Sequence, residues 1–229
     1  MATFGMDMRR ALYAGRLDRT GICRTLPGMS DSAPTGLLLV LSGPSGVGKT
    51  TIAHRVQERF DGIFSVSATT RPRSSDEVDG EDYTFVDPET FQTMLDAGEF
   101  LESAEVFGKH AYGTPRGPVQ RRLDEGRLVI LDIDVQGARQ IRDSLPESFM
   151  LFILPPSEEE LQRRLEARGR DDEEAIQRRF AEARHEIELA TTSDLYDAFV
   201  VNADLETAIQ ETCELIAARM QHGPRESTA

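Results

Sequence analysis

The chain has 229 residues, 39% of them hydrophobic, and a formal net charge of −14 at pH 7. This length fits one α/β domain with small subdomains and a buried core, and no apolar run approaches the roughly 18 residues of a membrane span. The acidic charge argues against nucleic acid or an anionic membrane as a partner, and the two cysteines, Cys23 and Cys213, form no disulfide framework, which favours a reducing cytoplasm.

Residues 1–35 differ in composition from the rest of the chain. They contain five arginines and lack sustained apolar periodicity. No apolar segment follows the arginines, so we expect no secretory signal, and Asp7 and Asp18 count against a transit peptide. We expect either a disordered tail or translation that begins at Met29. The intact mass of the native protein distinguishes the two.

The first apolar run, Leu37–Leu41, leads into residues 43–50, which read GPSGVGKT and match the pattern G-x-x-x-x-G-K-[ST] in full. Strand, glycine-rich loop and helix is the context in which this motif binds a nucleoside triphosphate. The glycines let backbone N–H groups turn toward the phosphates, and the helix N-terminus adds a partial positive charge. We expect Lys49 to reach the outer phosphates of ATP and the Thr50 hydroxyl to bind Mg²⁺; an ordinary glycine turn is the alternative. The expected ATP-binding residues of this loop are Gly43, Pro44, Ser45, Gly46, Val47, Gly48, Lys49 and Thr50.

Strands and helices alternate along the chain, which predicts βαβ units and a parallel sheet. A polar, turn-rich insertion at 68–116 and an arginine-rich helix pair at 161–184 interrupt this core. Pro88 stands at a tolerated first-turn position, and Ser157 with Glu160 matches a capping box. The expected strands are at 37–42, Phe64–Ser67, Tyr83–Val86, Arg127–Ile133, Phe149–Leu154 and Phe199–Asn202. The expected helices are at 49–60, from Asp87-Pro88 onward, from Ser157 to about Gly169, at about 172–191 and at Leu205–Met220.

Specific sequence blocks occur in a fixed order along this stretch: TTR at 69–71, EVDGEDY at 77–83, AEVFG at 104–108, YGT at 112–114, LDIDVQG at 131–137 and ILPPS at 153–157. From about Gly36 to Arg219 this set resembles the guanylate kinase family, whose members phosphorylate GMP at the expense of ATP. The resemblance implies an α/β P-loop NTPase fold, a three-layer α/β/α arrangement with a parallel core sheet, an inserted GMP-binding subdomain and a helical lid. It also implies Mg²⁺ as the cofactor of ATP and dGMP as a further acceptor. The implied boundaries are a domain at 36–220 with its core at 36–67, 117–160 and 185–220, the GMP-binding insertion at 68–116, the lid at 161–184 and a tail at 221–229.

The acceptor site needs a cationic clamp for the phosphate and a reader for the base. The donor fork of arginine suits phosphate, and tyrosine donates without adding a buried charge. Guanine presents two donors, N1–H and the 2-amino group, so ionised carboxylates, which only accept, match guanine and not adenine. Without the resemblance, the arginines would simply solvate a loop and Glu102 would be an exposed charge at a helix end. The clamp candidates are Arg71 and Arg73 with Tyr83 and Tyr112, and the resemblance places Ser67, Glu102, Thr114 and Asp134 at the base.

Two departures from the family pattern affect this site. Family members read TTR-x-PR, whereas this chain reads TTR-PR, so Ser74 occupies the usual position of the second clamp arginine. Either the loop shifts and Arg73 reaches the phosphate, which we favour, or the site has one clamp arginine. The chain also has one residue more than usual before Tyr112, in Lys109-His110-Ala111, which bears on the assignment of Tyr112 and Thr114.

Asp132 and Asp134 stand two residues apart on the strand expected at 127–133, so we expect both side chains on one face. At the carboxyl end of a strand beside the P-loop they would point into the nucleotide crevice. Asp132 is then the candidate that orients Mg²⁺ or its waters, and Asp134 reaches the acceptor base. A capping aspartate is the alternative.

Arg164 and Arg168 are four residues apart and share a helix face, and Arg179 lies on the next helix. The resemblance makes these three, with Lys49, the residues that contact the transferring phosphoryl group, and it places Asn202 near the adenine of ATP. A solvated face rich in arginine and glutamate is the alternative.

The nucleophile in such a reaction is a phosphate oxygen of GMP, so no general base is needed and catalysis is positioning plus charge neutralisation. The four histidines form no catalytic set. Two other classes stay open: a non-catalytic guanylate-kinase-like binding module, which typically lacks the P-loop and clamp residues present here, and a P-loop kinase of another small phosphorylated acceptor. The expected partners are the small molecules ATP and GMP, and the sequence does not decide between a monomer and a homo-oligomer.

Overall fold

The computed structural model describes residues 36–106, 109–167 and 172–222. The predictions for residues 1–35 and for Arg168 lie outside the described residues. The helices are α1 (Lys49–Phe60), α2 (Pro88–Asp96), α3 (Arg116–Asp124), α4 (Val135–Ser144), α5 (Glu158–Glu166), α6 (Glu173–Thr192) and α7 (Leu205–His222). The strands are β1 (Leu37–Ser42), β2 (Ile63–Phe64), β3 (Ala68–Thr69), β4 (Thr84–Phe85), β5 (Phe100–Val106), β6 (His110–Pro115), β7 (Leu128–Asp132), β8 (Phe149–Leu154) and β9 (Ala198–Val201).

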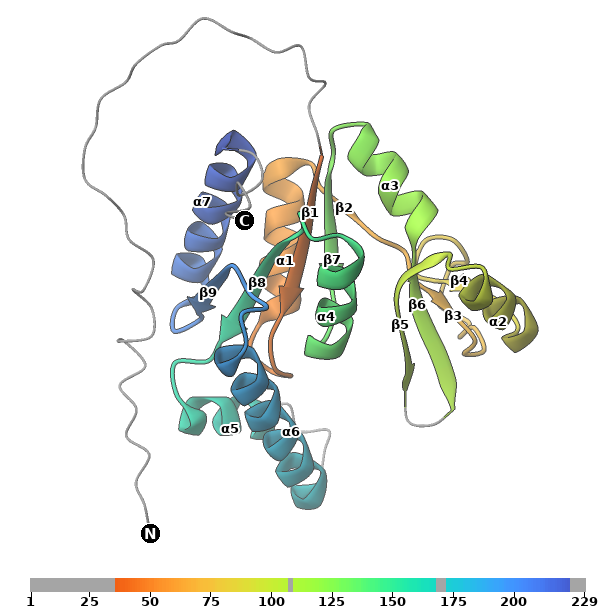
Figure 1. The fold of residues 1–229 in the computed structure, drawn as a ribbon. Coiled ribbons are helices and arrows are strands. Elements are labelled where there is room, and N and C mark those ends of the chain that lie inside the picture. The colour runs from red at the N-terminus through yellow and green to blue at the C-terminus, as the bar shows by residue number, and fades with distance from the viewer. Residues whose placement is uncertain (1–35, 107–108, 168–171, 223–229) are drawn as a thin grey trace, which may run out of the picture. The chain divides into compact units, whose positions relative to one another are not determined.

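Five parallel strands form the central sheet, in the order β2-β7-β1-β8-β9 (Figure 1). β1 lies in the middle, between β7 and β8. Every residue of β1 and of β8 is buried, which explains why both strands appear in the sequence as uninterrupted apolar runs. The predicted parallel α/β core is therefore confirmed.

Alternate residues of β1 pack into two separate cores, one on each face of the sheet. Leu39 belongs to the core that includes Ile52 of α1 and Ile216 of α7. Val40 belongs to the core that includes Ile141 of α4. Because successive side chains of a strand point to opposite faces, helical layers cover both sides of the sheet.

The insertion forms a second sheet, with the strand order β4-β3-β6-β5. β5 and β6 are antiparallel, and their register places Glu102 opposite Thr114. Phe91 of α2 and Phe100 of β5 stack with their ring centroids 4.6 Å apart and form a small apolar core with Ala68. The insertion thus folds around a core of its own.

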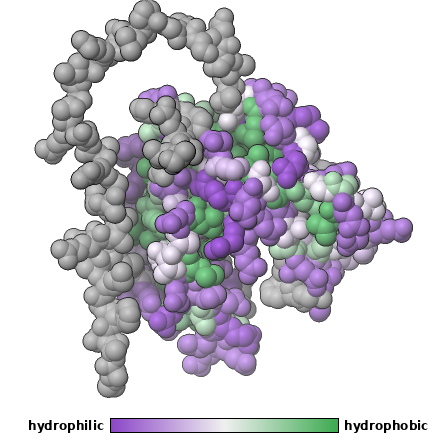
Figure 2. Space-filling model, viewed as in Figure 1, coloured by the Kyte–Doolittle hydropathy of each residue, from purple (hydrophilic) through white to green (hydrophobic). Residues whose placement is uncertain are grey.

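Helices α5 and α6 form a pair that packs through Leu161, Leu165 and Ala183. The Ser157 hydroxyl accepts a hydrogen bond from the Glu160 N–H at 3.2 Å, which confirms the serine half of the predicted capping box. The Glu160 carboxylate instead accepts hydrogen bonds from Arg163 and Arg164. The surface over this pair is strongly hydrophilic (Figure 2). No helix among the described residues combines the length and the apolar content needed to cross a lipid bilayer.

Several elements differ from those expected. The short strand predicted at Phe64–Ser67 lies instead at Ile63–Phe64, because the chain leaves the central sheet after Phe64 and enters the second sheet at Ala68. β5, β6, α3 and α4 were not predicted. A glycine interrupts the apolar pattern of each unpredicted helix, Gly117 in α3 and Gly137 in α4. The glycine at position 137 lies against the Glu102 carboxylate, where a larger residue would be crowded.

Candidate active site

The glycine-rich loop between β1 and α1 has the backbone that phosphate binding requires. Gly48 precedes α1 with φ 92°, in the left-handed region that favours glycine. A Cβ atom there would lie 2.6 Å from the amide nitrogen of Asn202. Asn202 is 4% exposed, and its side-chain amide donates a 2.7 Å hydrogen bond to the Val47 carbonyl. Asn202 therefore holds the loop in place through this hydrogen bond. Its contact with adenine stays a prediction.

Lys49 and Thr50 both contact Asp132 at the end of β7. The Lys49 ammonium lies 2.7 Å from one carboxylate oxygen, and the Thr50 hydroxyl donates to the other at 3.3 Å. The residues predicted to bind the outer phosphates and the metal thus meet at one point. A cavity of about 390 Å³ opens beside them, and it is lined by residues 43–51, Asp132, Asp134 and Glu186.

The donor atoms at this point suit Mg²⁺. The described residues contain no cluster of three or more histidine, cysteine or acidic side chains that could hold a metal by themselves. Mg²⁺ is typically held by one or two carboxylates together with substrate phosphates and water molecules. The Thr50 hydroxyl and the Asp132 carboxylate are hard oxygen donors beside the phosphate loop and therefore fit that ion.

Asp134 does not lie on the strand, which corrects the prediction that both aspartates share a strand face. β7 ends at Asp132, and Asp134 caps α4 by accepting a 2.8 Å hydrogen bond from the Gly137 N–H. A period of two puts side chains on one face only within a strand, and the chain changes to a helix at Asp134. Both carboxylates nevertheless line the same cavity.

Glu102 is a buried strand residue, so the alternative of an exposed charge at a helix end is wrong. It is 7% exposed and accepts a 2.6 Å hydrogen bond from the Thr114 hydroxyl across the β5–β6 pair. Burial raises the pKa of Glu102, and the nearby Asp134 carboxylate raises it further. A Cβ atom at Gly137 would lie 3.3 Å from a Glu102 carboxylate oxygen, so the glycine in α4 makes room for this group.

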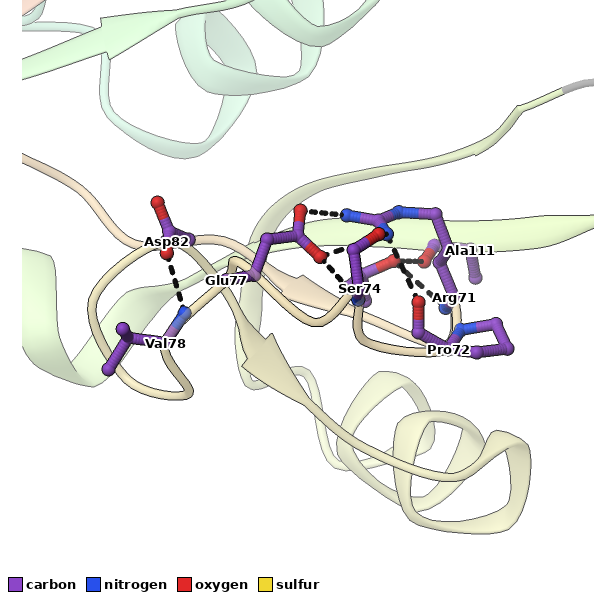
Figure 3. Close-up of polar contacts among 8 residues, drawn as sticks. Arg71, Pro72, Ser74, Glu77, Val78, Asp82 and Ala111 are labelled. Atoms are coloured by element: carbon purple, nitrogen blue, oxygen red, sulfur yellow. Dashed lines mark hydrogen bonds and ion pairs between the residues drawn. The ribbon is translucent and has the colours of Figure 1, made fainter.

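Arg71 is held by an internal carboxylate, Glu77. Figure 3 shows the Glu77 carboxylate facing the guanidinium. The two N–O distances are 2.5 and 3.1 Å. The Ser74 N–H donates to the same carboxylate at 2.8 Å. The hydrogen bonds from Arg71, followed by that from Ser74, lower the pKa of Glu77 to about 2.

The two tyrosines of the predicted clamp lie beside Arg71. The guanidinium carbon is 5.4 Å from the centre of the Tyr83 ring, and the Tyr83 and Tyr112 rings meet edge-to-face at 5.9 Å. Arg73, in contrast, is exposed and forms no hydrogen bond or ion pair within the described part of the chain. Ser67 precedes β3, where its carbonyl accepts a hydrogen bond from the Thr84 N–H at 2.9 Å. The structure thus groups Arg71, Tyr83 and Tyr112, and Arg73 is not part of that group.

The arginines of the helix pair approach the phosphate loop from α5 and α6. Arg179 donates to the Ser45 hydroxyl at 3.0 Å. Arg164 donates to the Asn202 carbonyl at 3.0 Å and pairs with Glu160 at 2.8 Å. Both of these predicted residues therefore lie next to the P-loop or its support.

Two acidic residues of the site were missed in the sequence. Glu77 belongs to the EVDGEDY block, and its spacing of six residues from Arg71 carries no signal outside regular structure. Glu186 lines the P-loop cavity from α6. It could have been found because it follows Arg179 by seven residues, two helical turns, and so shares its face.

The fold is a parallel sheet covered by helices, and it carries a complete phosphate loop whose last two residues, Lys49 and Thr50, both contact Asp132. These features define a P-loop nucleotide-binding protein. The family model described as guanylate kinase matches residues 35–219, and the chain belongs to that family. It is 50% identical over 177 residues to the guanylate kinase of Nostoc sp., covering 77% of this chain and 87% of the relative. The guanylate kinase of Nitratidesulfovibrio vulgaris is 52% identical over 178 residues, covering 77% and 84% of the two chains. The crystal structure of guanylate kinase from Anaplasma phagocytophilum aligns with a TM-score of 0.60 at 36% identity and covers 85% of this chain and 89% of that one.

Proposed function

We propose that this chain transfers the γ-phosphoryl group of ATP to GMP, giving ADP and GDP, and that dGMP is a second acceptor. Family membership over most of the chain supports this activity. One observation supports the assignment of ATP to the P-loop and of GMP to Glu102 and Asp134. A single cavity is lined by both the P-loop and Asp134, and Asp134 lies near the buried Glu102.

On the donor side, residues 43–50 bind the phosphates of ATP through backbone N–H groups and Lys49. Thr50 and Asp132 hold Mg²⁺, which neutralises phosphate charge when it is bound. Lys49 pairs with Asp132 in the free protein, so its ammonium is already at the cavity and exchanges a carboxylate for a phosphate oxygen. Arg164, Arg168 and Arg179 supply the positive charge around the transferring group.

On the acceptor side, Glu102 and Asp134 accept hydrogen bonds from N1–H and the 2-amino group of guanine, and Ser67 and Thr114 complete the base site. Thr114 already donates to Glu102, which orients one carboxylate oxygen and leaves the other for the base. An adenine base would place its N1 acceptor against these acceptors, and a mismatched buried polar group costs about 1–3 kcal/mol.

Arg71, Tyr83 and Tyr112 bind the phosphate of GMP, and Arg73 joins them if its loop moves. The Glu77 carboxylate occupies the guanidinium of Arg71 in the free protein with the two-oxygen geometry that a phosphate also offers. A phosphate of GMP therefore adds to this pair or displaces it.

The chemical step follows from these positions. The attacking phosphate oxygen of GMP is anionic near neutral pH, so the chain holds both phosphates in line and neutralises their charge without removing a proton. We place this reaction in the cytoplasm, in keeping with the free, buried Cys213. ATP and GMP are its small-molecule partners.

A coupled assay of ADP release with Mg²⁺-ATP tests the proposal directly, with GMP, AMP, CMP and UMP compared as acceptors. We expect kcat/KM for GMP to exceed that for AMP by about 100-fold or more, the value of two or more mismatched polar contacts. Folded protein that binds ATP but turns over none of the four would contradict the proposal.

A further inference from the structure

Glu186 is an acidic residue of the P-loop cavity that has no part in the proposed binding of ATP or GMP. It lies on α6, is half-buried, and lines the cavity together with Lys49 and Asp132. Within residues 36–106, 109–167 and 172–222 it forms no hydrogen bond or ion pair. A partly desolvated carboxylate without a partner is costly, so its placement points to a partner that the chain itself does not supply.

The position of Glu186 is fixed by the same helix that reaches the phosphate loop. Arg179, seven residues earlier on α6, donates to the Ser45 hydroxyl at 3.0 Å. Residues two turns apart share a helix face. The helix therefore contacts the loop through Arg179 and presents Glu186 to the cavity from the same face.

The charges around Glu186 show what kind of partner is missing. Lys49 of α1 favours the ionised carboxylate, whereas burial, Asp134 before α4 and Glu182 on α6 raise the pKa of Glu186 to about 7. Lys49 already pairs with Asp132 at 2.7 Å. One ammonium thus faces the three carboxylates that line this cavity, those of Asp132, Asp134 and Glu186, and a further cation would balance them.

We propose that Glu186 is a positioning residue for the divalent cation that accompanies ATP. Its carboxylate accepts hydrogen bonds from water molecules bound to the cation, while Thr50 and Asp132 contact the ion or its waters. Mg²⁺ keeps several of its waters in proteins, and groups that bind such waters tune the affinity of a metal site. This inference rests on the proposed Mg²⁺-ATP site.

The test measures ADP binding by calorimetry, with Mg²⁺ and with EDTA, for the wild type, Glu186→Gln and Glu188→Gln. Glu188 is the matched control because it is an exposed glutamate on the same helix that does not line the cavity. We expect Glu186→Gln to weaken binding of Mg²⁺-ADP about tenfold. Metal-free ADP should bind to this variant equally well or more tightly than to the wild type, because the carboxylate that repels the phosphates is gone. Glu188→Gln should change neither affinity, and Glu186→Asp, which keeps the charge, should weaken binding of Mg²⁺-ADP less than Glu186→Gln.

GMP-dependent ADP release from the wild type shows separately whether the proposed function holds. If it does, two results would overturn the inference about Glu186. Equal weakening with and without Mg²⁺ would mean that Glu186 positions Lys49 or the loop and not the cation. Unchanged binding in both conditions would make Glu186 a bystander. If the wild type bound no ADP at all, the donor site and this inference would fall together.

Discussion

At the scale of single residues, Lys49 is the group on which transfer of the phosphoryl group should depend most. It lies at the start of α1, beside the phosphate loop, and the Asp132 carboxylate holds its ammonium 2.7 Å away at the cavity. No other described lysine or arginine lines that cavity.

We expect Lys49→Ala to lower kcat by about 100-fold or more, since one preorganised charge at a transferring group is worth that much. Steady-state ADP release at saturating ATP and GMP measures this. Leu205, an exposed residue at the start of α7, offers a control, because Leu205→Ala removes no group of the site. Near-normal turnover of Lys49→Ala would contradict the P-loop assignment.

The phosphate clamp gives the second prediction at this scale. Arg71 is grouped with both tyrosines, whereas Arg73 is exposed without a partner among the described residues. If the loop shifts on binding, Arg73→Ala raises the KM for GMP about tenfold, the value of one charged hydrogen bond, and Arg71→Ala raises it at least as much.

Steady-state KM values for GMP, with the KM for ATP as the internal control, decide between one clamp arginine and two. A tenfold effect for Arg71→Ala alone would show that the site has a single clamp arginine and that Arg73 only solvates the loop.

At the scale of elements, α4 contacts both carboxylates that we propose as readers of the base. Asp134 caps its first turn, and Gly137 leaves room for Glu102. A Cβ atom at Gly137 would lie 3.3 Å from Glu102 and 3.5 Å from Asp134, whereas a Cβ atom at Gly117 of α3 meets only the Arg121 guanidinium at 3.7 Å.

We therefore expect Gly137→Ala to raise the KM for GMP about fivefold, since displacing the carboxylates costs about 1 kcal/mol, and to leave the KM for ATP unchanged. Gly117→Ala is the matched control in a neighbouring helix and should change neither constant. Equal KM values for GMP in the two variants would show that α4 does not set the base site.

The loop between β3 and β4 gives a prediction on pH. The pKa of Glu77 lies at about 2, below its usual 4.5, because Arg71 and Ser74 bind the ionised form. A lowered pKa in the folded state stabilises the protein above pH 4.5, and this stabilisation is lost as the pH falls toward 2.

Urea unfolding of the wild type and Glu77→Gln between roughly pH 6 and pH 3 measures this contribution. The difference in unfolding free energy should shrink as the pH falls. Glu81→Gln, a change of an exposed side chain four residues on, is the control. A difference that stays constant with pH would show that the pair with Arg71 does not stabilise the fold.

At the scale of the whole molecule, the sequence was sufficient to predict those elements in which burial or backbone geometry dictates the residue type. β1, β8 and α1 begin and end where predicted, because central parallel strands need continuous apolar residues and the phosphate loop needs its glycines. The family resemblance, confirmed by the comparisons, supplied the candidate site residues that periodicity alone could not provide.

What could not be predicted depends on contacts between distant segments. Glu102 and Thr114 meet only because β5 and β6 pair, and Glu102 itself interrupts the apolar pattern of β5. Glu186 reaches the P-loop only because α6 packs over it. The start of α4 did have a local signal, since Asp134 is followed by buried residues at helical spacing, Val135, Ala138 and Ile141.

The central claim is that two carboxylates, the buried Glu102 of the insertion and the exposed Asp134 at the start of α4, select guanine beside a P-loop. The most direct test is the ratio of kcat/KM for GMP to that for AMP in the wild type and in Glu102→Gln. Glutamine keeps the shape of Glu102, but its amide can donate to adenine N1, so we expect the ratio to fall about tenfold or more while the KM for ATP is unchanged. An unchanged ratio would contradict the claim that Glu102 reads the base.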